Sequence, residues 1–139
     1  MPELPFKILG IEHIGIAVED LNGISDIFGD LLGLELRSRE KIDDQQVITD
    51  IYETGNSKLE FLKATDKNSP ITQFIEKKSA GMHHIALKVD NLTVALDYLK
   101  SQGTQLVDTS PRIGAEGFKI AFMHPKSTGG VLIELCEKK

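Results

Sequence analysis

Two histidines occupy matching places in a sequence that is internally repeated. Residues 11–18 read IEHIGIAV and recur, 71 positions later, as MHHIALKV at residues 82–89. Self-similarity at a fixed offset indicates that a chain is built from copies of one structural unit. The offset aligns His13 with His84, each near the start of a segment rich in branched apolar residues. Two imidazoles at equivalent positions are candidates for a shared metal site.

Two glutamates follow the same repeat. Glu60 lies in the apolar segment LEFL and Glu134 in the apolar segment IELC, and these segments close the two halves of the chain. A buried carboxylate is costly unless it is paired or coordinates a metal. If the halves pair with approximate two-fold symmetry, the two glutamates and the two histidines meet, and this ligand set suits a divalent transition metal. A six-coordinate ion would keep two positions for water or substrate.

Each of these residues, taken alone, has a simpler interpretation. A single histidine on an apolar strand is more often structural than a ligand, and a single glutamate in mid-strand can face solvent. The two-residue period of a strand places His13 on one face with Gly15, and His84 on one face with Ala86. These small neighbours leave room beside each imidazole. The duplication makes a shared metal site the better interpretation.

The elements that would carry these side chains follow the order strand, helix and three strands. In the first half, apolar periodicity predicts a strand over 11–18, a helix over 21–31 that Gly33 ends, and strands over 34–42, 47–54 and 57–63. A connecting helix is predicted to begin at Ser69-Pro70, because serine suits the N-cap and proline the first helical position.

The second half repeats this order. It predicts a strand over 82–89, a helix capped by Asn91 or Thr93 and stopped by Gly103, and strands near 104–108, 117–123 and 130–136. Residues 109–117 form the longest irregular stretch. Neither half is large enough to fold alone, so we expect one domain over residues 1–139, with repeats at approximately 8–65 and 80–137.

Composition narrows the class of protein. The chain has 139 residues, a net charge of −5 and one cysteine, Cys136. A mildly acidic chain without a cluster of Lys and Arg is a poor nucleic-acid binder, and a lone cysteine fits a reducing compartment. The start, Met1–Lys7, does not resemble a signal or transit peptide, and no apolar run approaches the roughly 20 residues that cross a bilayer. We expect a cytoplasmic protein with no nucleic-acid or membrane partner.

At these residues the sequence resembles the vicinal oxygen chelate superfamily, and more closely the methylmalonyl-CoA epimerase family. The resemblance runs over about residues 8–137. Its superfamily part rests on residues 11–18, on KLEFL at 58–62 and on GMHHIA at 81–86. The segments PRIGA at 111–115 and HPKSTGGVLIELC at 124–136 point to the epimerases.

The resemblance implies an α+β fold, in which two tandem β-α-β-β-β modules form a cupped eight-stranded mixed sheet around one divalent metal. The ion would be Co²⁺ or Mn²⁺, with Zn²⁺, Ni²⁺ and Mg²⁺ as alternatives. The resemblance also implies a homodimer and the interconversion of (R)- and (S)-methylmalonyl-CoA, an acyl-CoA thioester of propionate metabolism. The metal ligands that it implies are His13, Glu60, His84 and Glu134.

The reaction needs two bases. A Lewis-acidic metal that chelates the thioester oxygen and the malonyl carboxylate would stabilise an enolate, and epimerisation needs one base on each face of it. The resemblance assigns one base to Glu134 and the other to the acid 16 residues before Glu60, which is Asp44. The family usually has glutamate there, and aspartate is one methylene shorter. Asp43 is the alternative, and a plain turn is the simplest interpretation of both.

Three polar residues are candidates for contacts with the CoA or carboxylate end of the substrate: Arg112, Lys126 and Ser127. Ordinary loop polarity is the alternative. Two other functions stay open, namely a glyoxalase I-like lyase acting on a glutathione thiohemiacetal and a non-catalytic small-molecule-binding protein of the same fold. An extradiol dioxygenase is disfavoured, because its facial triad uses two histidines and one carboxylate.

Overall fold

The computed structural model describes residues 3–139, which divide into two compact units. The N-terminal unit is His13–His83, and the C-terminal unit combines the residues up to Glu12 with His84–Lys139. Strand β1 (Ile8–Ala17) therefore contributes its first half to the C-terminal unit and its second half to the N-terminal unit. Met1 and Pro2, at the start of the segment expected to lack a targeting signal, lie outside the described residues.

The N-terminal unit contains a four-stranded sheet. Its strands are β1, β2 (Glu35–Ile42), β3 (Val47–Glu53) and β4 (Lys58–Ala64), in the order β2-β3-β4-β1. β4 runs parallel to β1, and the other neighbours are antiparallel. Each of these last three strands begins and ends within one residue of its predicted bounds. The prediction succeeded because each strand is an apolar-rich run bounded by turn residues.

The helix after β1 differs in type from the prediction. It is a π-helix, η1 (Ser25–Leu31), in which Leu32 N–H donates to the Ile27 carbonyl five residues back. Phe28 packs on Phe61 of β4, with ring centroids 4.7 Å apart, and this tertiary contact is invisible to helical spacing. The stop at Gly33 is confirmed, since this residue adopts a φ of 73° just after the helix.

The connecting helix α1 (Pro70–Lys78) follows the prediction closely. Ser69 is its N-cap, with an Oγ that accepts a hydrogen bond of 3.2 Å from Ile71 N–H, and Pro70 opens the first turn. Ile71 packs with Ala17, Val47 and Leu62. Helix α1 therefore covers the face of the sheet that carries Ala17, Val47 and Leu62.

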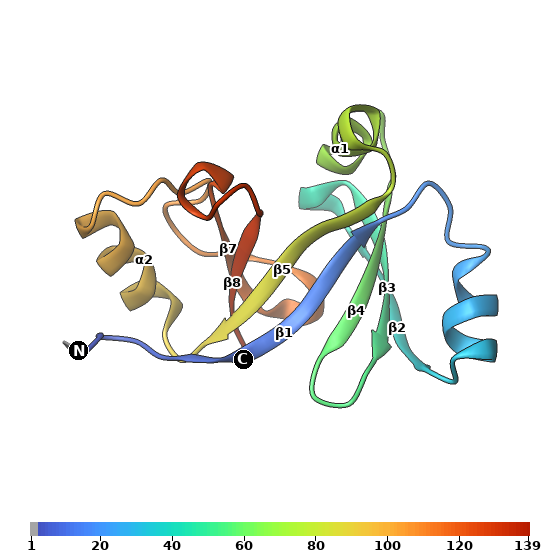
Figure 1. Cartoon of the computed structure of the whole chain (residues 1–139), viewed down its shortest axis with the longest axis horizontal. Helices are drawn as coiled ribbons and strands as arrows, with labels where there is room; N and C mark the ends of the chain where they lie inside the picture. Colours follow the sequence, from blue (N-terminus) through green and yellow to red (C-terminus); the bar gives the residue numbers. More distant parts are fainter. Residues whose placement is uncertain (1–2) are drawn as a thin grey trace. The chain divides into compact units, whose positions relative to one another are not determined.

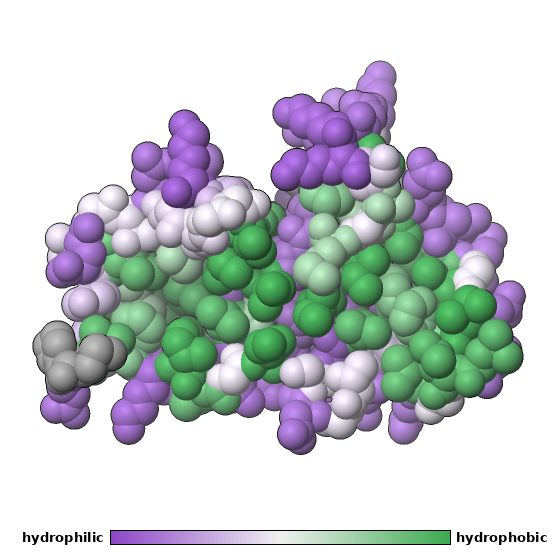
Figure 2. Space-filling model, in the orientation of Figure 1, coloured by the Kyte–Doolittle hydropathy of each residue, from purple (hydrophilic) through white to green (hydrophobic). Residues whose placement is uncertain are grey.

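An apolar surface patch lies over η1 and the start of β2. The hydrophobic area over this part of the N-terminal unit is visible in Figure 2. Apolar patches of this kind are typical of surfaces that contact another protein. The exposed side chains are Ile27, Leu31, Leu32 and Leu36.

The C-terminal unit repeats the strand order of the N-terminal unit. It contains most of β5 (Gly81–Val89), whose first three residues belong to the N-terminal unit, together with α2 (Leu92–Ser101), β6 (Arg112–Ile113), β7 (Lys119–Met123) and β8 (Ile133–Glu137). The order is β5-β8-β7-β6, with β8 parallel to β5 and antiparallel to β7. Asn91 is the N-cap of α2, which decides between the two predicted candidates, Asn91 and Thr93. Hydrogen bonding orders all eight strands as β2-β3-β4-β1-β5-β8-β7-β6, so the predicted α+β fold with a mixed eight-stranded sheet is confirmed.

One predicted strand is wrong. Residues 104–108 do not form a strand: they run beside the end of β7 and make only an isolated bridge, between Leu106 and Met123. The amides of Val107 and Asp108 both donate to the Phe122 carbonyl, which interrupts the alternation that a ladder needs. The edge strand is instead β6, inside the segment 109–117 that was expected to be irregular.

The two faces of the C-terminal sheet are packed differently. Helix α2 lies beside β7 and β8, and its Leu92, Ala95 and Leu96 bury the face that carries Leu135 (Figure 1). The opposite face carries a separate cluster around Phe122. Three short 3-10 helices, η2 (Asp43–Gln45), η3 (Ala115–Gly117) and η4 (Pro125–Ser127), form turns. None of the helices within residues 3–139 is long and apolar enough to cross a membrane.

Candidate metal centre and active site

The N-terminal unit holds a buried histidine–glutamate pair. His13 on β1 places Nδ1 3.1 Å from Oε2 of Glu60 on β4, and the two side chains are only 6% and 5% exposed. Both elements were predicted as strands, and the parallel pairing of β4 with β1 brings these two residues together. A carboxylate so deeply buried needs a positive or polar partner.

The register of β1 and β4 explains how this pair is accommodated. Gly15 lies directly opposite Glu60, and His13 lies directly opposite Lys58. Directly opposed residues share a face of the sheet, so the carboxylate stands beside a residue without a side chain. The space over Gly15 lets Glu60 reach diagonally toward His13.

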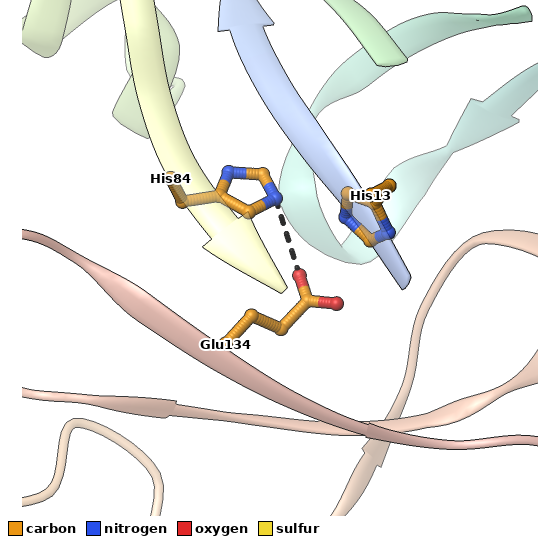
Figure 3. A group of neighbouring side chains, drawn as sticks. All are labelled: His13, His84 and Glu134. Carbon is orange, nitrogen blue, oxygen red and sulfur yellow. Dashed lines mark ion pairs between the residues drawn. The ribbon is translucent and has the colours of Figure 1, made fainter. Parts of the chain in front are cut away.

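The C-terminal unit holds the equivalent pair. His84 on β5 places Nε2 3.4 Å from Oε1 of Glu134 on β8, and each side chain is 5% exposed (Figure 3). Ala86 lies directly opposite Glu134. It is the counterpart of Gly15, so each unit combines an imidazole, a carboxylate and a small residue opposite that carboxylate.

The chemistry of the two pairs fits a metal centre. The buried side chains that could hold a metal ion include His13, Glu60, His84 and Glu134. Neutral imidazole and carboxylate are ligands for first-row divalent ions. A bound cation would also offset the cost of burying two carboxylates.

An aromatic residue stands beside the C-terminal pair. Phe122 lies opposite Glu134 in the pairing of β7 with β8. Its ring also contacts the His84 imidazole edge to face, with ring centroids 5.4 Å apart. The contact restricts the orientation of the imidazole. Sequence reasoning did not single out Phe122, because its role depends on the register of two strands.

Arg112 lies close to this group. Its guanidinium carbon is 5.6 Å from the centre of the Phe122 ring, and Nε is 3.4 Å from Oδ1 of Asp108. The Arg112 side chain is 35% exposed, so it is partly accessible to solvent. Arg112 is one of the three residues expected to contact substrate. It is linked to the His84–Glu134 pair through Phe122.

Lys126 and Ser127 lie in a turn. Both are exposed in η4, where His124 Nδ1 accepts from Lys126 N–H and Ser127 Oγ accepts from Gln105 N–H at 3.0 Å. These hydrogen bonds show how the turn is held. The described contacts do not link either side chain to the His84–Glu134 pair.

Asp43 and Asp44 lie in η2, between β2 and β3, and both are exposed. Glu60 is opposite Ile51, and Val47 begins β3 four residues before it, a distance of about 13 Å along the strand. Asp44 precedes Val47, so it lies beyond the end of β3 and still farther from Glu60. The Asp43 carboxylate is 3.7 Å from Lys41 Nζ at the surface.

The remaining histidines and the cysteine have structural surroundings. Burial lowers the pKa of His83 to about 4, and its ring meets Phe74 edge to face with centroids 4.9 Å apart. Cys136 is buried with Ile120 and Phe122. Glu12, which sequence reasoning passed over, is 3% exposed and lies 3.5 Å from Lys138 Nζ. Glu12 is also among the buried side chains that could hold a metal ion.

Comparisons with known proteins agree with this picture. Residues 12–122 match the model of the glyoxalase/bleomycin resistance protein/dioxygenase superfamily. The mitochondrial methylmalonyl-CoA epimerase of Mus musculus is 36% identical over 94% of this chain and 74% of its own. The crystal structure of methylmalonyl-CoA epimerase from Mycobacterium tuberculosis has a TM-score of 0.90 and 34% identity, and covers 95% of this chain and 89% of its own.

A further solved structure contains a bound thioester. It is a methylmalonyl-CoA epimerase in complex with methylmalonyl-CoA and NH4+, with a TM-score of 0.90 and 29% identity. The similarity covers 95% of this chain and 96% of that protein. The likeness therefore extends over both units.

Proposed function

Because the chain belongs to the glyoxalase/bleomycin resistance protein/dioxygenase superfamily, we propose that it is a metal-dependent epimerase that interconverts (R)- and (S)-methylmalonyl-CoA. The names and nearly full-length similarity of its relatives support this substrate. No feature of either unit specifically favours a lyase acting on a thiohemiacetal or a non-catalytic binding protein.

The duplicated buried pair carries the proposal. His13 with Glu60, and His84 with Glu134, supply two imidazoles and two carboxylates from equivalent places in the two units. We propose that all four bind one divalent ion. Co²⁺ or Mn²⁺ is favoured, with Zn²⁺, Ni²⁺ and Mg²⁺ as alternatives, because a mixed nitrogen and oxygen set does not choose among these ions by affinity alone. When bound, the ion supplies Lewis-acid polarisation of the thioester carbonyl.

Two carboxylates would move the proton. One takes the α-hydrogen, the C–H electrons pass into the enolate, and the conjugate acid of the other returns a proton to the opposite face. Glu134 and Asp44 are proposed for these roles, with Asp43 as the alternative to Asp44. The buried position of Glu134 supports a base shielded from water, whereas the exposed turn of Asp44 would have to approach the substrate when it binds.

The substrate would be held at two ends. The position of Arg112 against Phe122 supports a contact near the reacting end. Lys126 and Ser127, exposed in η4, are proposed for the CoA end. The apolar patch over η1 supports the proposed homodimer. A cytoplasmic location and a place in propionate metabolism stay predictions.

Hydrogen exchange tests the function. Metal-loaded protein is incubated with methylmalonyl-CoA in D₂O, and deuterium at the α-carbon is followed by mass spectrometry. The proposal predicts incorporation well above the rate without protein. Incorporation at the background rate, in a protein that has taken up metal, would exclude the epimerase. Propionyl-CoA, which lacks the second carboxylate, serves as the control substrate.

A further inference from the structure

Asp108 is tied to Phe122 by two hydrogen bonds. Asp108 N–H donates to the Phe122 carbonyl at 3.1 Å, and Phe122 N–H donates to Oδ2 of Asp108 at 2.9 Å. The Asp108 side chain is 17% exposed, so this bond is largely shielded from water. Two bonds to one residue fix the position of the carboxylate relative to β7.

The other oxygen of the same carboxylate faces Arg112. Oδ1 of Asp108 lies 3.4 Å from Arg112 Nε, an atom that is buried and makes no hydrogen bond among the described residues. The guanidinium carbon also lies over the Phe122 ring, 5.6 Å from its centre. Arg112 is thus held from two sides, by a negative charge at Nε and by an aromatic ring at the guanidinium carbon.

This arrangement places Arg112 close to the His84–Glu134 pair. Phe122, on which the guanidinium rests, also contacts the His84 imidazole and lies opposite Glu134. With Nε facing Asp108, no described contact within residues 3–139 engages the terminal nitrogens Nη1 and Nη2, so a ligand could bind there. A guanidinium edge of this kind binds a carboxylate through two parallel hydrogen bonds.

We propose that Asp108 is the positioning residue that holds the Arg112 guanidinium over Phe122, and that this guanidinium binds the free carboxylate of the thioester substrate. The proposal rests on the proposed function for the identity of the thioester. Asp108 acts through Arg112 and touches no reacting atom. The consequence is a preference for malonyl-type over simple acyl thioesters that depends on Asp108.

Binding of two thioesters to the Co²⁺-loaded full chain tests this, by calorimetry with malonyl-CoA and propionyl-CoA. Asp108→Asn keeps an oxygen that can accept from Phe122 N–H but removes the charge that faces Arg112. It should raise the Kd for malonyl-CoA about tenfold and leave the Kd for propionyl-CoA unchanged, since charge-assisted bonds are the strong ones. The matched control is Asp97→Asn, because Asp97 is 72% exposed and 3.9 Å from Lys100 on α2; neither Kd should change.

A double-mutant cycle separates positioning from a structural role. In the Arg112→Ala background, Asp108→Asn should have no further effect on malonyl-CoA binding, because its only route of action has been removed. Additive losses would overturn the proposal, as would equal weakening of both thioesters or no change in either. Deuterium exchange decides the epimerase separately. If the wild-type protein shows no deuterium exchange, but Asp108→Asn still removes the preference for malonyl-CoA, the epimerase proposal is refuted and the role of Asp108 stands.

Discussion

Glu60 lies directly opposite Gly15 in the parallel pairing of β4 with β1, and from there its carboxylate reaches His13 at 3.1 Å. In the C-terminal unit, Glu134 lies opposite Ala86 and reaches His84 at 3.4 Å. The same three-residue arrangement occurs twice, in units with the same strand order. The small residue is thus part of the site, since it provides the room in which carboxylate and imidazole approach.

Filling that room should weaken metal binding. Gly15→Val places a branched side chain beside the Glu60 carboxylate, and we expect metal affinity to fall about tenfold or more, in the range found for changes that disturb ligand orientation. Ala86→Val should do the same in the other unit. Titration calorimetry with Co²⁺ measures this, and circular dichroism checks that the variants fold. Wild-type affinity in a folded Gly15→Val protein would refute this role.

The second base can be assigned by substitution. If Asp44 carries the proton on one face of the enolate, Asp44→Asn should slow epimerisation about 100-fold or more, because general-base catalysis contributes at least that much. The change should act on kcat, with substrate affinity and metal content maintained. A loss in Asp43→Asn instead would assign the role to Asp43. Full activity in both variants would leave η2 without a catalytic role.

An ion pair between an exposed arginine and a buried aspartate, on the face of the N-terminal sheet opposite Glu60, should stabilise the fold. Arg39 binds Asp50 through two hydrogen bonds of 2.6 and 2.9 Å, which raise the pKa of Arg39, and Asp50 is 3% exposed. Arg39→Ala leaves this carboxylate buried without its cation. We expect a loss of about 2 kcal/mol in the free energy of unfolding, below the value for a fully buried pair because the arginine is partly solvated.

The neighbouring pair on the same two strands is the control. Arg37 and Glu53 are 2.8 Å apart, but both side chains are more than 40% exposed. Arg37→Ala should cost less than about 1 kcal/mol, as exposed ion pairs do. Urea denaturation of both variants measures the difference. Equal losses would mean that burial of Asp50 does not set the strength of its pair.

The strands and the two pairs were predictable from sequence because they depend on local regularities. The two-residue period of β1 puts His13 and Gly15 on one face, and the repeat transfers the argument to His84 and Ala86. Burial of a lone acid in an apolar strand then required a partner. Each of these predictions rests on residues that are only a few positions apart in the sequence, together with the internal repeat.

The remaining features depend on contacts that spacing does not encode. Asp108 meets Phe122 N–H across 14 positions of sequence, through a segment that looked like an ordinary strand. The π-helical form of η1 accompanies the packing of Phe28 on Phe61. The edge strand β6 forms only because β7 is there to pair with it. The prediction of one domain over residues 1–139 stays a prediction, as does convergence of the two pairs on one ion.

Metal stoichiometry tests that central claim most directly. Apo-protein is titrated with Co²⁺ and Mn²⁺, and bound metal is measured by calorimetry and elemental analysis, for the wild type and for Glu60→Ala, Glu134→Ala and Glu53→Ala. Glu53 is a partly exposed β3 residue, with a side chain that is 41% exposed, and serves as control. A site shared by both pairs predicts one ion per chain, lost or strongly weakened when either Glu60 or Glu134 is removed and unchanged in Glu53→Ala. Two ions per chain, or full metal binding in either of the first two variants, would contradict it.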